Sequence, residues 1–125
     1  VRSMESSVLM YRSGHGKVQV QVIFDTNTFW LSQQRMAELF GVTVPTINYH
    51  LDQIEQSGEI HLSDAIRKIR IPSDKWSGEV MMYNLDVVIA VGYRVNSYEA
   101  TQFRIWATQV LKDTTSSELF KTVNY

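Results

Sequence analysis

The sequence has no cysteine, only two prolines and only six glycines among its 125 residues. The absence of cysteine excludes a disulfide framework, a thiolate metal site and a thiol nucleophile. No apolar run approaches the roughly 20 residues that a membrane span requires. The first residues, VRSMESS, lack the apolar segment of a secretory signal. We therefore expect one cytoplasmic domain without membrane contact, long enough to bury a core without a metal or cofactor.

Charge is also scarce, and it is unevenly distributed. A net charge of −1 argues against a strongly basic nucleic-acid binder. Residues 31–59 contain one cation and four carboxylates, whereas residues 67–75 contain four cations and one carboxylate. Residues 94–112 contain three cations and one carboxylate. Positive charge therefore lies beside residues 31–59 in the sequence, not within them.

Residues 31–53, LSQQRMAELFGVTVPTINYHLDQ, have the spacing of a helix-turn-helix. Ser32 can cap the first helix, and Gly41 follows its last apolar residue, where a left-handed conformation commonly ends a helix. Thr43 can cap the second helix, and Pro45 is tolerated in its first turn. Apolar residues recur along one side of the second helix: Ile47, Leu51 and Ile54. The alternative interpretation is a helical hairpin inside an ordinary core.

The other side of the second helix carries uncharged hydrogen-bonding groups of the kind that read base edges: Thr46, Asn48, Tyr49 and Gln53. Asn48 is the residue best suited to pair with adenine through two hydrogen bonds. Thr43 and the helix N-terminus are expected to contact a phosphate.

Alternating apolar residues predict two β-hairpins around this helical pair. Residues 8–12 and 18–24 flank a Gly-containing turn, and residues 25–27 form a second turn before a short strand at 28–30. Residues 65–72 and 79–85 flank a Ser/Asp/Gly-rich tip at 73–78, which is typical of the wing of a winged helix. The wing cations expected to contact phosphates are Arg67, Lys68, Arg70 and Lys75. Trp76 at the tip either inserts against a sugar or a partner or folds back on its own hairpin.

The last third of the chain reads as helical. Asn84 or Asp86 can begin a helix that ends near Gly92, and Asn96 with Glu99 resembles a capping box for the next helix. That helix has the most regular apolar stripe in the chain, formed by Phe103, Trp106, Ala107, Val110 and Leu111. Two further cations, Arg94 and Arg104, are expected either to bind backbone carbonyls or to contact phosphates.

Three segments are therefore predicted. Residues 1–7 are expected to be a disordered N-terminus, with Val1, Arg2 and Ser3 before Met4 as a cloning remnant. Residues 8–112 form the domain, which is α+β: a winged helix-turn-helix with an N-terminal β-hairpin, a β-hairpin wing and C-terminal helices. Residues 113–125 have a polar Ser/Thr cluster and are predicted to be a poorly packed tail or an oligomerisation arm.

These motifs resemble the virulence protein RhuM family of bacteria over residues 8–112. The likeness rests on residues 30–33 (WLSQ), 36–40 (MAELF), 83–86 (YNLD), 91–97 (VGYRVNS) and 101–108 (TQFRIWAT), together with the V-x-V strand of the first hairpin, Thr46-Ile47, His50 and Val110-Leu111. The segment at 101–108 is also similar to the end of the Bro-N domain of phage antirepressors. The resemblance implies a DNA-binding or regulatory domain of mobile-element and virulence-associated proteins. Members of this family are typically longer than this chain, so the resemblance also implies truncation after Lys112.

The leading functional prediction is a transcriptional regulator that binds double-stranded DNA as a homodimer on two half-sites. The alternative is an antirepressor-like protein-interaction module with no direct DNA binding, because Asp52 and Glu55 would repel phosphates if they faced the groove. An enzyme is not expected: the three histidines have no metal-ligand spacing, and no nucleophile, acid pair or small-molecule site is visible.

Overall fold

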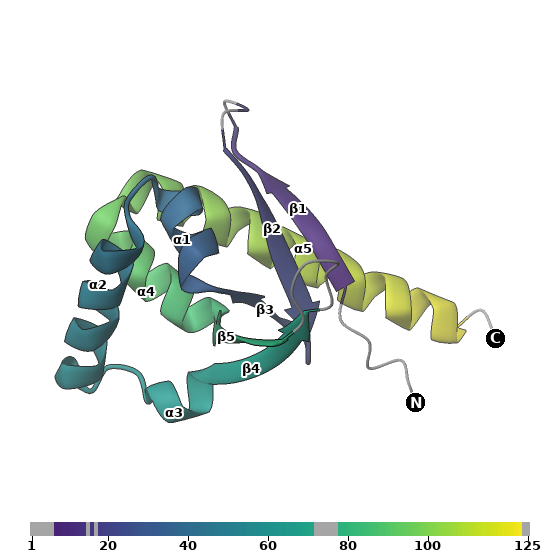
Figure 1. The fold of residues 1–125 in the computed structure, drawn as a ribbon. Helices are drawn as coiled ribbons and strands as arrows, with labels where there is room; N and C mark the ends of the chain where they lie inside the picture. The colour runs from purple at the N-terminus through teal and green to yellow at the C-terminus, as the bar shows by residue number, and fades with distance from the viewer. Residues whose placement is uncertain (1–6, 15, 17, 72–77, 124–125) are drawn as a thin grey trace.

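The computed structural model describes all residues except 1–6, 15, 17, 72–77 and 124–125, so Lys75 and Trp76 lie outside the described residues. The strands are β1 (Ser7–Arg12), β2 (Gln19–Asp25), β3 (Thr28–Leu31), β4 (Ile66–Ile71) and β5 (Gly78–Asn84). The helices are α1 (Gln33–Phe40), α2 (Val44–Ser57), α3 (Leu62–Ala65), α4 (Leu85–Val95) and α5 (Ser97–Val123). Together these elements form a mixed α and β fold, which confirms the predicted class (Figure 1).

The five strands form one antiparallel sheet in the order β1-β2-β3-β5-β4. The predicted first hairpin pairs Ser7 with Phe24 and Arg12 with Gln19. Its inward residues Val20 and Val22 are buried, as their alternation predicted. β3 pairs with β5, so the second hairpin is joined to the first through the strand that leads into α1.

A two-residue turn joins β2 to β3. Asp25 pairs with Thr28, and the two residues between them, Thr26 and Asn27, have φ values of 51° and 63°. Positive φ at both central positions matches the right-handed twist of the flanking strands, and Asn tolerates it better than most residues. The turn predicted at residues 25–27 is confirmed.

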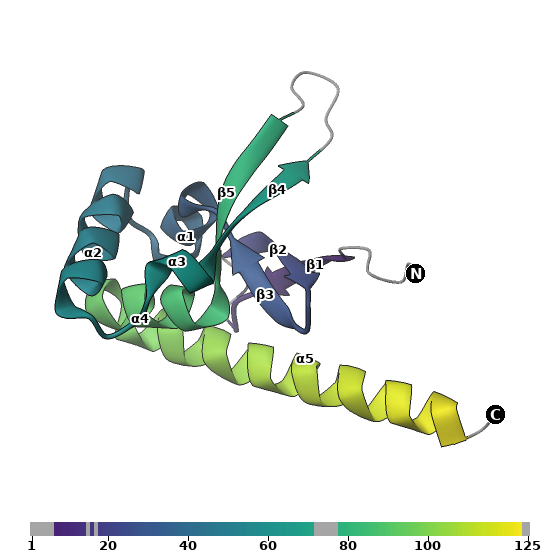
Figure 2. The ribbon, with the colours of Figure 1, turned by 90° about the horizontal axis from the view of Figure 1, so that it is seen from below.

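The helices pack on one another and on the sheet around a continuous core. Tyr11 of β1 and Phe29 of β3 meet α5, where the rings of Tyr11 and Phe103 lie 5.1 Å apart and those of Phe29 and Trp106 lie 5.3 Å apart. Figure 2 shows α5 running beneath the other elements, with the β4–β5 hairpin projecting past α1 on the opposite side. None of the described helices is long and apolar enough to cross a membrane.

One expectation about the C-terminal helices is wrong. α4 does not end near Gly92 but continues to Val95, with Gly92 buried inside it. The backbone of α5 continues past Lys112 to Val123. Residues 97–123 contain no glycine or proline, so nothing interrupts the helical hydrogen bonds. The boundary of the domain at residue 112, and a poorly packed tail or an oligomerisation arm after it, stay predictions.

Candidate nucleic-acid interface

The helical pair α1–α2 forms as its capping residues predict. The Ser32 hydroxyl accepts a hydrogen bond from the Arg35 N–H at 3.2 Å, and Gly41 ends α1 with a φ of 72°. The Thr43 hydroxyl accepts from the Thr46 N–H at 3.3 Å at the start of α2. The stripe of Ile47, Leu51 and Ile54 is buried, so the opposite side of α2 faces outward.

The predicted base-reading residues lie on this outward side but not in one row. Asn48 and Tyr49 are exposed, whereas Thr46 and Gln53 are half-buried. Asn48 follows Val44 by one turn, and Val44 shares an open groove with Met81 of β5. Tyr49 and Gln53 border a different depression on the α4 side. α2 therefore presents two polar flanks, and Asn48 lies on the one that continues from Val44, the residue that shares the groove with Met81.

The first turn of α2 is already engaged in local bonds. The hydroxyl oxygens of Thr43 and Thr46 lie 3.0 Å apart, in addition to the capping bond between them. No acidic residue occupies this turn, which keeps its positive partial charge available to an anion. The exposed carboxylates Asp52 and Glu55 follow Asn48 by one and two turns.

The β4–β5 hairpin separates its cations onto two faces. Lys68 pairs with Met81 and Arg67 pairs with Met82, so the two cations lie on opposite faces of the hairpin. Tyr83 has the same parity as Met81, and its hydroxyl accepts a hydrogen bond from Gln33 Nε2 of α1 at 3.0 Å. Through Tyr83, the face that carries Lys68 contacts Gln33 at the beginning of α1. Met82 on the opposite face lines a cavity with Ser32, Gln34 and Arg35. Lys68 is exposed, and Arg70 follows at the next position of the same parity.

Arg67 is held by the sheet instead. Its guanidinium lies 3.3 Å from Asp25 Oδ2 and 5.0 Å from the centre of the Trp30 ring. Trp30 Nε1 in turn donates to the Asp25 carbonyl at 3.0 Å. The cation therefore joins the hairpin to the β2–β3 turn, a role that sequence reasoning missed because Asp25 is far from Arg67 in the chain.

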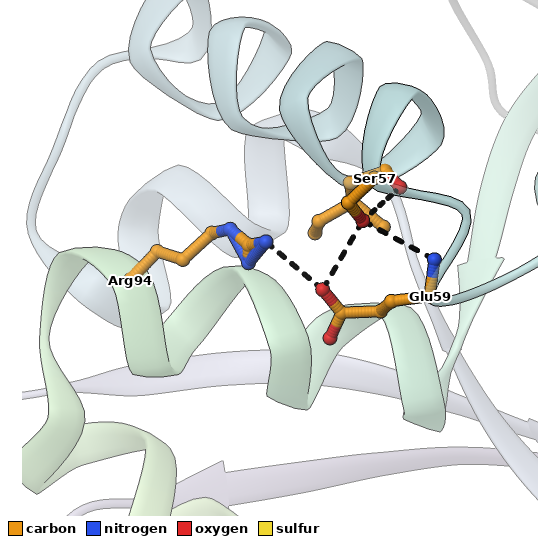
Figure 3. Close-up of polar contacts among 4 residues, drawn as sticks. Ser57, Glu59 and Arg94 are labelled. Atoms are coloured by element: carbon orange, nitrogen blue, oxygen red, sulfur yellow. Dashed lines mark hydrogen bonds and ion pairs between the residues drawn. The ribbon is translucent and has the colours of Figure 1, made fainter.

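Arg94 is paired across the α2–α4 junction. Its Nη2 lies 2.9 Å from Glu59 Oε1, and the Ser57 hydroxyl bridges Glu59 to the end of α2 (Figure 3). The remaining cation, Arg104, donates from Nε to the Tyr93 hydroxyl at 3.0 Å. Hydrogen bonds from Arg104 and then Thr101 lower the pKa of Tyr93. Both arginines thus have protein partners, and these partners are not the backbone carbonyls that one alternative predicted.

A second connection, between the α4–α5 corner and α1, was not predicted. Asn96 Oδ1 accepts from the Glu99 N–H at 3.3 Å, which confirms the predicted cap, while its Nδ2 donates to the Phe40 carbonyl at 3.2 Å. The Phe40 ring also lies against Gly92, so close that a Cβ there would meet Phe40 Cζ at 2.5 Å. We call Phe40, Gly92 and Asn96 the corner contact.

The part of the chain that the structure describes holds no group of three or more His, Asp or Glu side chains that could bind a metal ion. A cavity of about 170 Å³ lies between the two hairpins and α1. No carboxylate and no imidazole lines it; its residues are Gln21, Ile23, Trp30, Leu31, Ser32, Gln34, Arg35, Val80 and Met82.

The β4–β5 hairpin and the α4–α5 corner lie in a segment that matches a known protein family. Residues 65–119 match the virulence protein RhuM family. This match confirms the resemblance that the motifs indicated. It covers β4, β5, α4 and most of α5, whereas the helical pair lies outside the RhuM match. No curated protein and no solved structure matches the chain.

Proposed function

We propose that the protein is a DNA-binding transcriptional regulator built on a winged helix-turn-helix. α2 enters the major groove, and the β4–β5 hairpin acts as the wing. The observation that carries the proposal is the shared orientation of two surfaces: the hairpin face with Lys68 and Met81 borders Val44 and Gln33 at the beginnings of α2 and α1. A duplex lying against α2 would therefore run along the cation-bearing face of the hairpin.

The residues on the two sides of α2 have different proposed roles in binding DNA. Asn48, exposed and one turn after Val44, is the proposed reader of adenine, since its amide matches N6 and N7 of that base. Tyr49, Thr46 and Gln53 reach neighbouring positions from the other flank. Thr43 and the positive N-terminal end of α2 contact a phosphate. Asp52 and Glu55 restrict the approach to the first two turns of α2, because carboxylates repel the backbone of DNA.

We propose that Lys68, Arg70 and Lys75 contact DNA phosphates and supply most of the salt-dependent affinity. Arg67 positions the wing through Asp25 and Trp30, so its contribution to DNA affinity is indirect. Arg94 and Arg104 can reach phosphate only by sharing their present partners, Glu59 and Tyr93. Because one such module reads few base pairs, we propose a homodimer on two half-sites.

We propose no enzymatic activity and a cytoplasmic location.

An antirepressor-like protein-interaction module is the second candidate. The exposed Asp52 and Glu55 on α2 favour it, as does the pairing of Arg67 with Asp25, which removes one cation from the wing. In this alternative a basic partner surface would bind the outward side of α2, and DNA would not be bound directly.

The salt dependence of DNA binding tests the proposal. Fluorescence anisotropy on a random duplex at several salt concentrations gives the slope of log K against log salt, which reports the number of neutralised phosphates. Lys68→Ala should reduce that slope by about 1. Arg67→Ala should leave the slope nearly unchanged, and Lys112→Ala, an exposed lysine on α5, is the matched control. Absence of binding at low salt would refute direct DNA binding and favour the interaction module.

A further inference from the structure

Among the described strands, β4 and β1 form the two edges of the sheet, and they differ in charge. β4 carries three cations in six residues, IRKIRI, and charges on an edge strand prevent pairing with another chain. β1, SVLMYR, has no charge before Arg12. Two of its apolar side chains face solvent, with Val8 62% and Met10 50% exposed. β1 is therefore the edge that lacks protection.

α5 extends beyond this same edge. Among the α5 residues whose side chains are described, Leu111 is the last that packs against the core, and the helix continues through Val123. At 1.5 Å per residue, twelve further residues extend it by about 18 Å. Both views show this part of α5 leaving the body of the molecule on the side of β1 (Figures 1 and 2). An unprotected strand and a projecting helix thus mark one side of the molecule.

We infer that this side binds a second copy of the chain, with β1 pairing antiparallel to β1 of the other copy. A two-fold axis at Leu9 places Val8 of each copy opposite Met10 of the other. In this register the exposed apolar side chains of both copies meet on one face. The result is a continuous ten-stranded sheet across the dimer, and each projecting helix runs onto the neighbouring copy.

The chemistry favours a second copy over an unrelated chain. A two-fold axis requires a surface that is complementary to itself, and a strand with no charge from Ser7 to Tyr11 and with Val8 and Met10 exposed satisfies this requirement. Pairing of two six-residue strands alone is small compared with the 1,200–2,000 Å² or so that stable interfaces bury. The backbone of α5 beyond Leu111 extends on the same side of the molecule, where it can add to the contact between the strands. This interface does not depend on DNA binding, although a dimer suits the proposed regulator.

Light scattering after size exclusion, on the full chain without DNA, tests the inference. The protein should elute with twice the monomer mass of 14.4 kDa. The double variant Val8→Lys/Met10→Lys places like charges opposite each other at two symmetric points and should raise the dimer dissociation constant about ten-fold or more. Val8→Glu/Met10→Lys places opposite charges across the interface in the proposed register and should restore the dimer.

The controls separate this inference from the proposed function. Met81→Lys introduces the same charge at an exposed strand position in the other hairpin and should leave the mass at the dimer value. Circular dichroism verifies that each variant is folded, which the exposure of Val8 and Met10 leads us to expect. A monomeric wild type, or a dimer insensitive to both lysines, would overturn the inference. A dimer that binds no DNA would refute only the proposed function.

Discussion

Gly92→Ala should destabilise the protein, although alanine is the better helix former. Helix propensity alone predicts a gain of about 1 kcal/mol for this change in a helix interior. The structure opposes it, because an added Cβ would lie 2.5 Å from Phe40 Cζ and 2.7 Å from the Ala100 Cβ. The ring is 2% exposed and Ala100 belongs to α5, so neither group can move without displacing a helix.

The magnitude follows from these two opposing effects. Forcing a methyl group into a packed core costs typically 1–3 kcal/mol, and contact with two constrained neighbours places this site at about 3 kcal/mol. Subtracting about 1 kcal/mol of helix propensity leaves a loss of about 2 kcal/mol in the free energy of unfolding. For a chain of this length the midpoint of thermal unfolding should fall by about 8 °C.

Differential scanning calorimetry of four proteins checks this reasoning: wild type, Gly92→Ala, Phe40→Leu and the double variant. Phe40→Leu alone should destabilise, because it removes ring atoms that fill the space over Gly92. In the double variant the shorter side chain makes room for the methyl group, so its loss should be smaller than the sum of the single losses. A Gly92→Ala variant that is more stable than the wild type would refute the close approach of Phe40.

Substitutions of Asn96 and Tyr11 test two further contacts within the fold. Asn96→Ala removes both the cap on Glu99 N–H and the bond to the Phe40 carbonyl, and should lower the free energy of unfolding in urea by about 2 kcal/mol. Asn96→Asp keeps the cap but cannot donate to Phe40, so an equal loss in the two variants would contradict a stabilising role for the cap. Burial, followed by the charges of Glu99 and Tyr98, raises the pKa of Tyr11 to about 12. The unfolded chain loses this proton near pH 10, so stability should fall between about pH 10 and pH 12, and Tyr11→Phe should remove that part of the decrease.

The sequence predicts the elements whose determinants are local. Ser32, Gly41 and Thr43 delimit α1 and α2 because capping bonds join residues only a few positions apart. The alternation of Val20 and Val22 determines which face of β2 is buried, and the turn residues determine where the hairpin closes. In each case a short window contains all the atoms that decide the outcome.

The sequence does not predict contacts between distant segments. In the sequence, Gly92 is a residue type that commonly ends a helix, but in the structure the Phe40 ring requires a glycine there because it leaves no space for a Cβ. Arg67 reads as a free wing cation because its partners, Asp25 and Trp30, belong to an earlier turn and strand. The polar composition after Lys112 predicts a poorly packed tail or an oligomerisation arm and does not reveal that the helix continues, because a polar segment without glycine or proline is compatible with a helix.

The contacts between distant segments distinguish residues that hold α1 and α2 in place from residues that α2 exposes on its surface. Tyr83, Arg94 and Asn96 hold α1 and the end of α2 in place, and all three lie in the segment that matches the RhuM family. The exposed residues of α2, such as Asn48 and Tyr49, contribute little to this support. Substitution of Asn48 should therefore alter target choice without loss of stability, whereas substitution of Asn96 should weaken stability and binding together. In the proposed regulator, specificity thus resides outside the matched segment and its geometric support lies within it.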